Sequence, residues 1–79
     1  MHTQEPICTK VMGVVREVLP KFGLAYLEDQ QGWVWVVTAS CAGPGLATMQ
    51  PGDIFQLKLA KYDDKTFVSS YASSYQRMP

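Results

Sequence analysis

The sequence predicts a single all-β domain, a small barrel of five strands, and three observations predict it. Apolar and polar residues alternate with the period of a β-strand in several short segments. Glycine and proline separate those segments, and no stretch shows a sustained helical period. The 79 residues suffice for one domain and not for two. A closed barrel suits such a short chain because closure limits exposed strand edges.

The first three strands are expected in the N-terminal half of the chain. Lys10–Leu19 is rich in valine and stops before a proline, which cannot donate a hydrogen bond to a ladder. Phe22–Glu28 alternates large and small side chains, and Trp33–Val37 alternates again. Residues 29–32 predict a hairpin loop in which Gly32 is free to take a positive φ.

The last two strands follow a longer connection. Residues 38–50 are dense in glycine and proline, with one short helical turn expected at Leu46–Met49. A Pro-Gly-Asp turn at 51–53 precedes the fourth strand, Ile54–Lys61, and a polar turn precedes the fifth, Thr66–Tyr71. Five short strands with a long link after the third is the strand plan of an OB-type barrel.

The barrel is expected to span residues 10–72. Segments 1–9 and 73–79 are expected to be a flexible N-terminal segment and a flexible C-terminal tail. Met1–Glu5 is polar, which excludes a secretory core there, and the longest apolar run, Trp33–Val37, is too short to cross a bilayer. A cytoplasmic protein is therefore predicted, with no membrane partner.

The charge and the inventory of reactive side chains restrict the possible functions. Seven Lys/Arg balance seven Asp/Glu, so a phosphate-binding site must come from uneven placement of few basic residues, and its binding should be weak. Cys8 and Cys41 are expected to be reduced, and with His2 they show no zinc spacing. We find no nucleophile–base pair and no phosphate-binding glycine loop. We therefore expect no enzyme, no metal, no organic cofactor and no small-molecule substrate.

Two families of OB-type barrel resemble this chain in short motifs over roughly residues 10 to 70. Gly13-Val14-Val15-Arg16, Phe22-Gly23-Leu24-Ala25-Tyr26-Leu27 and Val34-Trp35-Val36 resemble, in order, the first three strands of the cold-shock domain. The stretch from Gly13 to Pro20, together with Pro51-Gly52-Asp53 and Leu57 to Asp63, is similar to the S1-like barrel of the smallest bacterial translation initiation factor. Both resemblances imply binding of nucleic acid.

The chain departs from both families at residues that the binding uses. The positions that stack on bases in cold-shock domains correspond here to Glu17, Leu24, Tyr26, Trp35 and Val37, of which only Tyr26 and Trp35 are aromatic. The initiation factor carries a basic segment after its third strand, where this chain has the uncharged residues 38–50.

Alternation places a candidate binding surface on the second and third strands. If Gly23, Ala25, Leu27, Val34 and Val36 face the interior, then Phe22, Leu24, Tyr26, Trp33, Trp35 and Val37 stand together outside. Tyr26 and Trp35 would then stack on bases, helped by Trp33 and Phe22. Arg16 and Lys21 would contact phosphates, and Lys10 could do so at the same edge. The predicted nucleic-acid-binding residues are Arg16, Lys21, Phe22, Leu24, Tyr26, Trp33 and Trp35.

Other interpretations stay open. Tyr26 and the two tryptophans could instead form the core, since a small domain needs their area. Lys58, Lys61 and Lys65 are interpreted as the solvated flanks of a turn. The leading prediction is a module that binds single-stranded RNA or DNA weakly and with little sequence preference. The alternative is a protein-interaction or homodimerisation module that uses the same apolar face.

Overall fold

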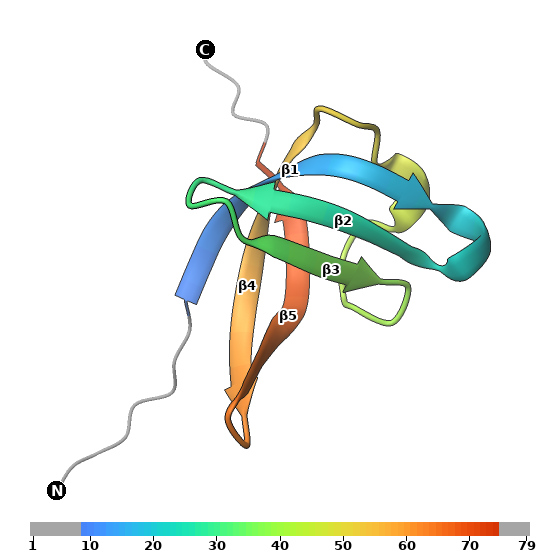
Figure 1. The fold of residues 1–79 in the computed structure, drawn as a ribbon. Coiled ribbons are helices and arrows are strands. Elements are labelled where there is room, and N and C mark those ends of the chain that lie inside the picture. The colour runs from blue at the N-terminus through green and yellow to red at the C-terminus, as the bar shows by residue number, and fades with distance from the viewer. Residues whose placement is uncertain (1–8, 75–79) are drawn as a thin grey trace, which may run out of the picture.

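A computed structural model describes residues 9–74 and shows an all-β fold (Figure 1). Five strands form one antiparallel sheet in the order β3-β2-β1-β4-β5. Their bounds are β1 (Thr9–Leu19), β2 (Leu24–Asp29), β3 (Val34–Thr38), β4 (Ile54–Tyr62) and β5 (Lys65–Ser73). Two short 3-10 turns accompany them, η1 (Pro20–Phe22) and η2 (Leu46–Thr48). The prediction of five strands in an all-β domain is confirmed.

The longest strand, β1, joins the two halves of the sheet. Its N-terminal half pairs with β4 and its C-terminal half with β2. Gly13 lies where the two ladders overlap, and an added Cβ there would stand 3.0 Å from Leu57 and 3.1 Å from Leu27. Arg16 has no partner in the register with β2, which marks a β-bulge and increases the local twist. The strand therefore bends, and β2 and β3 cross the β4–β5 hairpin steeply (Figure 1).

The hydrophobic core lies between these two layers. Every strand contributes to it, as does the long connection between β3 and β4. Its buried side chains are Val15, Ala25, Leu27, Val37, Met49, Phe55, Leu57, Leu59, Val68 and Tyr71. Because successive strand residues point to opposite faces, the residues between these core positions point away from the core.

Tyr71 holds the long connection, residues 39–53, against β5. Its hydroxyl oxygen accepts a hydrogen bond from the Gly45 N–H at 2.8 Å, and its own N–H donates to the Ala42 carbonyl at 2.9 Å. Gly43 lies so close to the ring that a Cβ there would overlap it. The ring also packs edge-on against Phe55, with 5.8 Å between centroids. One buried tyrosine thus positions a segment that contains little regular structure.

The sheet is not closed into a continuous ring of ladders. Its edge strands are β3 and β5, and no ladder joins them within residues 9–74. They nevertheless approach each other where the chain leaves β3. There the Cys41 thiol donates to the Val68 carbonyl at 3.3 Å, and Ala42 forms a single parallel bridge with Ser70.

Several predicted boundaries were wrong. Trp33, predicted to begin the third strand, lies in the loop before β3. Phe22 belongs to η1 rather than to a strand, because Gly23 takes a left-handed conformation with φ of 67° and donates its N–H to the Pro20 carbonyl. The last strand continues beyond Tyr71 to Ser73, which pairs with Phe55. Thr9, predicted in the N-terminal segment, begins β1. The remainder of the predicted terminal segments, residues 1–8 and 75–79, lies outside the described residues, and so do Cys8 and His2.

Candidate nucleic-acid interface

The outward side chains of β2 and β3 form an apolar strip, which we call the β2–β3 face. It consists of Leu24, Tyr26 and Glu28 from β2 and Val34, Val36 and Thr38 from β3. Tyr26 lies directly opposite Val36 and is half-buried. Val34 and Val36 are 56% and 42% exposed, large fractions for valine. The centre of the strip is therefore one aromatic ring beside two exposed aliphatic side chains.

The structure corrects the predicted orientation of β3. Trp35 and Val37, expected outside, pair with Leu27 and Ala25, which are completely buried. Directly paired residues share a face of the sheet, so Val37 is buried and Trp35 packs against the core. Val34 and Val36 point outward instead of inward. Trp35 therefore leaves the predicted stacking surface.

Asp29 holds Trp35 in this position. Its Oδ2 accepts a hydrogen bond from Trp35 Nε1 at 2.8 Å, and its Oδ1 accepts from the N–H groups of Gln31 and Trp33. The hydrogen bond from Trp35 lowers the pKa of Asp29 below its ordinary value, burial opposes this effect, and the backbone N–H groups of residues 31 to 33 reinforce it. The carboxylate thus ties the β2–β3 loop to the side chain that enters the core.

The predicted phosphate contact at Arg16 is compromised by a neighbouring acid. Arg16 Nε lies 3.0 Å from Glu28 Oε1 in the only ion pair among residues 9–74. Glu17, which is exposed, pairs in register with Tyr26. The side of the β2–β3 face that borders β1 therefore carries one cation, Arg16, and two acids, Glu17 and Glu28.

The other predicted residues flank this face instead of extending it. Lys21 and Phe22 lie in η1 at one end of β2, and the Phe22 ring is 74% exposed. Trp33 lies in the hairpin loop at the opposite end and is 64% exposed. The structure thus places exposed rings at both ends of the strip, with Tyr26 between them.

A groove of about 350 Å³, which we call the seam, separates the edge strands. It is lined by Val36, Thr38, Ser40, Cys41, Phe67, Val68 and Ser69. Val36 also belongs to the β2–β3 face, so the strip continues into the seam. On the far side stands Phe67, which is 46% exposed and was not among the predicted binding residues.

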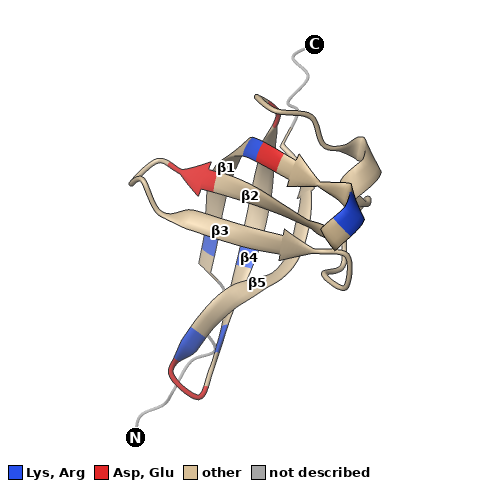
Figure 2. Cartoon of the chain, turned by 45° about the vertical axis from the view of Figure 1, so that its right-hand side comes forward, with Lys and Arg blue, Asp and Glu red and all other residues tan. Residues whose placement is uncertain are grey.

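Sequence reasoning also missed a basic surface on the outer side of β1, β4 and β5, which we call the lysine face. Its central residues are Lys10, Met12, Gln56, Lys58, Phe67 and Ser70. Figure 2 shows basic segments on the adjoining parts of β1 and β4, away from the acidic end of β2. Alternation within β4 places Lys58 outward between buried Leu57 and Leu59, which was a usable signal. That Lys58 lies opposite Lys10 on β1 could be seen only from the register of the sheet.

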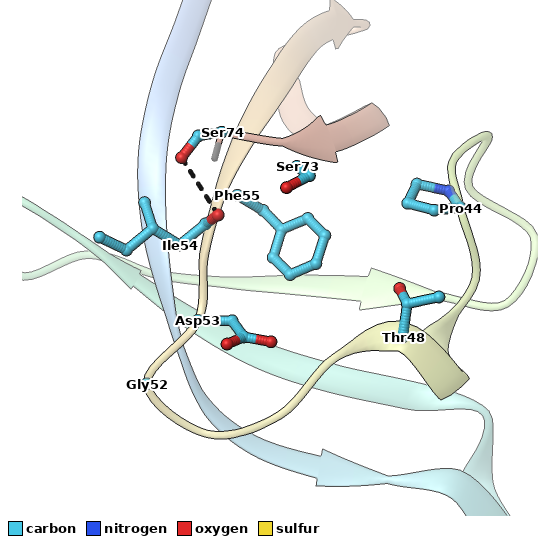
Figure 3. A pocket seen from close by; sticks show the side chains of 8 residues that line it. All are labelled: Pro44, Thr48, Gly52, Asp53, Ile54, Phe55, Ser73 and Ser74. Atoms are coloured by element: carbon cyan, nitrogen blue, oxygen red, sulfur yellow. Dashed lines mark hydrogen bonds between the residues drawn. The ribbon is translucent and has the colours of Figure 1, made fainter. Parts of the chain in front are cut away.

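A second pocket, about 550 Å³ and thus larger than the seam, lies between the long connection and the end of β5 (Figure 3). Its lining residues are Pro44, Thr48, Gly52, Asp53, Ile54, Phe55, Ser73 and Ser74. Its one carboxylate, Asp53, accepts a hydrogen bond from the Gln50 N–H, and the Ser74 hydroxyl donates to the Ile54 carbonyl. These contacts stabilise the turn before β4 and the end of β5.

Comparison of this chain with known proteins does not assign a function to it. Matches to protein-family models, curated proteins and solved structures were sought, and none was found. Within residues 9–74, no cluster of three or more His, Cys, Asp or Glu side chains could hold a metal ion. The same described part of the chain contains no helix with the length and apolarity needed to cross a membrane.

Proposed function

We propose that the protein is a small OB-type barrel, open along the seam, that binds single-stranded nucleic acid weakly and with little sequence preference. The strand order and the approach of the two edge strands support this assignment. OB-type barrels bind oligonucleotides over strands two and three and the connections beside them. In this chain those positions are the β2–β3 face and η1.

The observation that carries the proposal is Tyr26 at the centre of an exposed apolar strip with further rings at its ends. Every nucleic-acid base has a flat π-face, so stacking tolerates any sequence and contributes about 1–3 kcal/mol per base. Phe22 and Trp33 are exposed at the two ends. Lys21, beside Phe22, provides a cation for a phosphate at the η1 end.

The charges around Tyr26 explain why binding should be weak. Glu17 and Glu28 lie on the two strands beside it, and Glu28 engages Arg16. Phosphate contacts supply most of the sequence-independent affinity for nucleic acid. With one cation paired and a second acid nearby, stacking must contribute most of the affinity at this face.

The test is an anisotropy titration of dye-labelled single-stranded DNA and RNA with wild-type protein and with Tyr26→Ala. Loss of one stacking ring should weaken binding about 5- to 160-fold, from the stacking energy above. Tyr62→Ala is the matched control, because Tyr62 is 75% exposed at the end of β4, outside the β2–β3 face. Unchanged affinity in folded Tyr26→Ala, or equal loss in both variants, would refute this site.

The second candidate is a protein-binding or homodimer interface on the same β2–β3 face. The specific observation in its favour is that the centre of the face, Tyr26 with Val34 and Val36, is apolar, while the acids beside it, Glu17 and Glu28, oppose a phosphate backbone. Salt separates the two candidates, because phosphate contacts weaken steeply as salt rises whereas apolar contacts do not. Sedimentation of the free protein measures self-association directly.

A further inference from the structure

The lysine face has no acidic side chain among its central residues. At its centre, the outward residues are Lys10 and Met12 on β1 and Gln56 and Lys58 on β4. Phe67 and Ser70 continue the same face onto β5. The carboxylates along these strands lie beyond the central residues, at Glu17 in β1, at Asp53 just before β4 and at Asp63 and Asp64 in the hairpin turn. The face is therefore positive although the whole chain is neutral.

Two of its lysines lie directly opposite each other. Lys10 on β1 pairs in register with Lys58 on β4, and both are exposed. Directly opposed residues have Cβ atoms about 5 Å apart, and like charges in such pairs are destabilising. Neither lysine forms an ion pair with a described residue. An anion bound between the two ammonium groups would remove this repulsion.

The lysine face is continuous with the β2–β3 face. Phe67 pairs in register with Ala60 on β4, and it also lines the seam together with Val36. Val36 in turn lies opposite Tyr26. A strand that stacks on Tyr26 can therefore cross the seam at Val36 and Phe67 and reach the lysines without leaving the surface.

We propose that the lysine face is a second contact surface for the same nucleic-acid strand, with its phosphates bound between Lys10 and Lys58 and a base against Phe67. This inference rests on the proposed function and extends it, because it makes the footprint longer than the β2–β3 face. Short oligonucleotides occupy the β2–β3 face alone. Longer ones cross the seam and gain the phosphate contacts that the β2–β3 face lacks.

The experiment compares labelled single-stranded oligonucleotides of about 4 and about 12 nucleotides, lengths within the range that OB-type barrels cover. We expect Lys10→Gln and Lys58→Gln each to weaken binding of the long strand several-fold and to leave the short one unchanged. Each should also reduce the slope of log affinity against log salt by about 0.7, the effect of one lost phosphate contact on a single strand. Inorganic phosphate, added as a competitor, should displace the long strand only weakly if the site needs a continuous backbone.

Lys61→Gln is the matched control, since it removes the same charge from β4 at a position that alternates with the lysine face. It should change neither affinity nor salt slope. Without ligand, Lys58→Gln should raise the Tm by relieving the repulsion from Lys10, and Lys61→Gln should not. Equal effects of Lys58→Gln and Lys61→Gln on the long strand, or no effect of either, overturn the inference.

The two proposals fail in different ways. If Tyr26→Ala weakens both lengths while the lysine variants bind normally, the proposed function stands and the lysine face is excluded. If Lys58→Gln weakens the long strand while Tyr26→Ala binds normally, the lysine face binds nucleic acid by itself, and both the β2–β3 face and the continuous path are excluded. Absence of binding by the wild-type protein overturns both. Displacement of the long strand by phosphate ion at low concentration would show a site for free phosphate and also overturn the continuous path.

Discussion

Asp29 is the residue whose single carboxylate determines how β3 meets the core. It accepts hydrogen bonds from the Trp35 side chain and from two backbone N–H groups of the loop between them. A neutral acid would accept these bonds less well, which is why the hydrogen bond from Trp35 lowers the pKa of Asp29. The orientation of a large aromatic side chain is thereby coupled to one proton.

This coupling predicts an acid-dependent loss of stability. Because the pKa of Asp29 is lower in the folded than in the unfolded chain, its contribution is present above the unfolded value of about 3.9 and is lost as pH falls through the folded value. Asp29→Asn should therefore be less stable than wild type at pH 6, and the difference should shrink towards pH 2. Urea unfolding followed by tryptophan emission measures the stability of both proteins against pH, and parallel profiles would contradict the assignment.

At the scale of an element, the turn of the β4–β5 hairpin has an unusual backbone conformation. Its two-residue turn, Asp63-Asp64, joins the paired residues Tyr62 and Lys65, and both aspartates have positive φ, 54° and 70°. Such angles are those of a type I′ turn, for which Asp-Gly or Asn-Gly is preferred. The second aspartate therefore holds a backbone conformation that glycine adopts without strain.

Asp64→Gly should stabilise the protein. Relief of left-handed strain contributes about 1–2 kcal/mol, and the greater freedom of glycine in the unfolded chain offsets about half of it. The net gain in the free energy of unfolding should be about 0.5–1 kcal/mol, measured by urea denaturation. Asp64→Ala makes the same change of charge without relieving the strain, so equal gains in the two variants would rule out this explanation.

The strands differ in how well their pattern predicted their orientation. In β4, buried Phe55, Leu57 and Leu59 alternate with polar side chains, so only one orientation buries the apolar set. In β3, Trp35 and Val37 alternate with Val34 and Val36, and both sets are apolar. Periodicity cannot choose between two apolar faces. The choice was made by pairing with β2 and by the hydrogen bond from Trp35 to Asp29.

The candidate site was also predictable only where local pattern determines the position of a residue. Tyr26 was correctly placed on the outer side of the second strand, because alternation within that strand suffices. Phe22 and Trp33 are exposed as predicted, but they lie in η1 and in the hairpin loop, outside the strands in which alternation had placed them. The opposition of Lys10 and Lys58 was not predictable, since it depends on the register between strands that are distant in the sequence. Phe67 lies beside the β2–β3 face only because β5 approaches β3 at the seam, which also depends on contacts between distant parts of the sequence.

At the scale of the whole molecule, a thin core makes stability sensitive to single residues. Leu27 is completely buried and packs beneath Gly13, at the crossing of the two layers. Leu27→Ala should lower the free energy of unfolding by about 2–5 kcal/mol. That loss is a large part of the total expected for so short a chain, about 4–12 kcal/mol.

Leu27→Ala should destabilise the whole domain, so that circular dichroism shows a single cooperative melt at a lower Tm. Val34→Ala removes exposed aliphatic surface from the β2–β3 face and should change the free energy of unfolding by less than about 1 kcal/mol. Two separate transitions in Leu27→Ala, one for each layer, would show that the layers are stable independently.

The position of β1 between β2 and β4 has a consequence for the order in which the chain assembles. Three of the four ladders join strands that are neighbours in sequence and can form as hairpins within microseconds. The fourth, β1 with β4, must close a loop that contains β2, β3 and the long connection. The folding rate should therefore be governed by this single encounter, and a growing chain can form its first three strands while their apolar inner side still awaits β4.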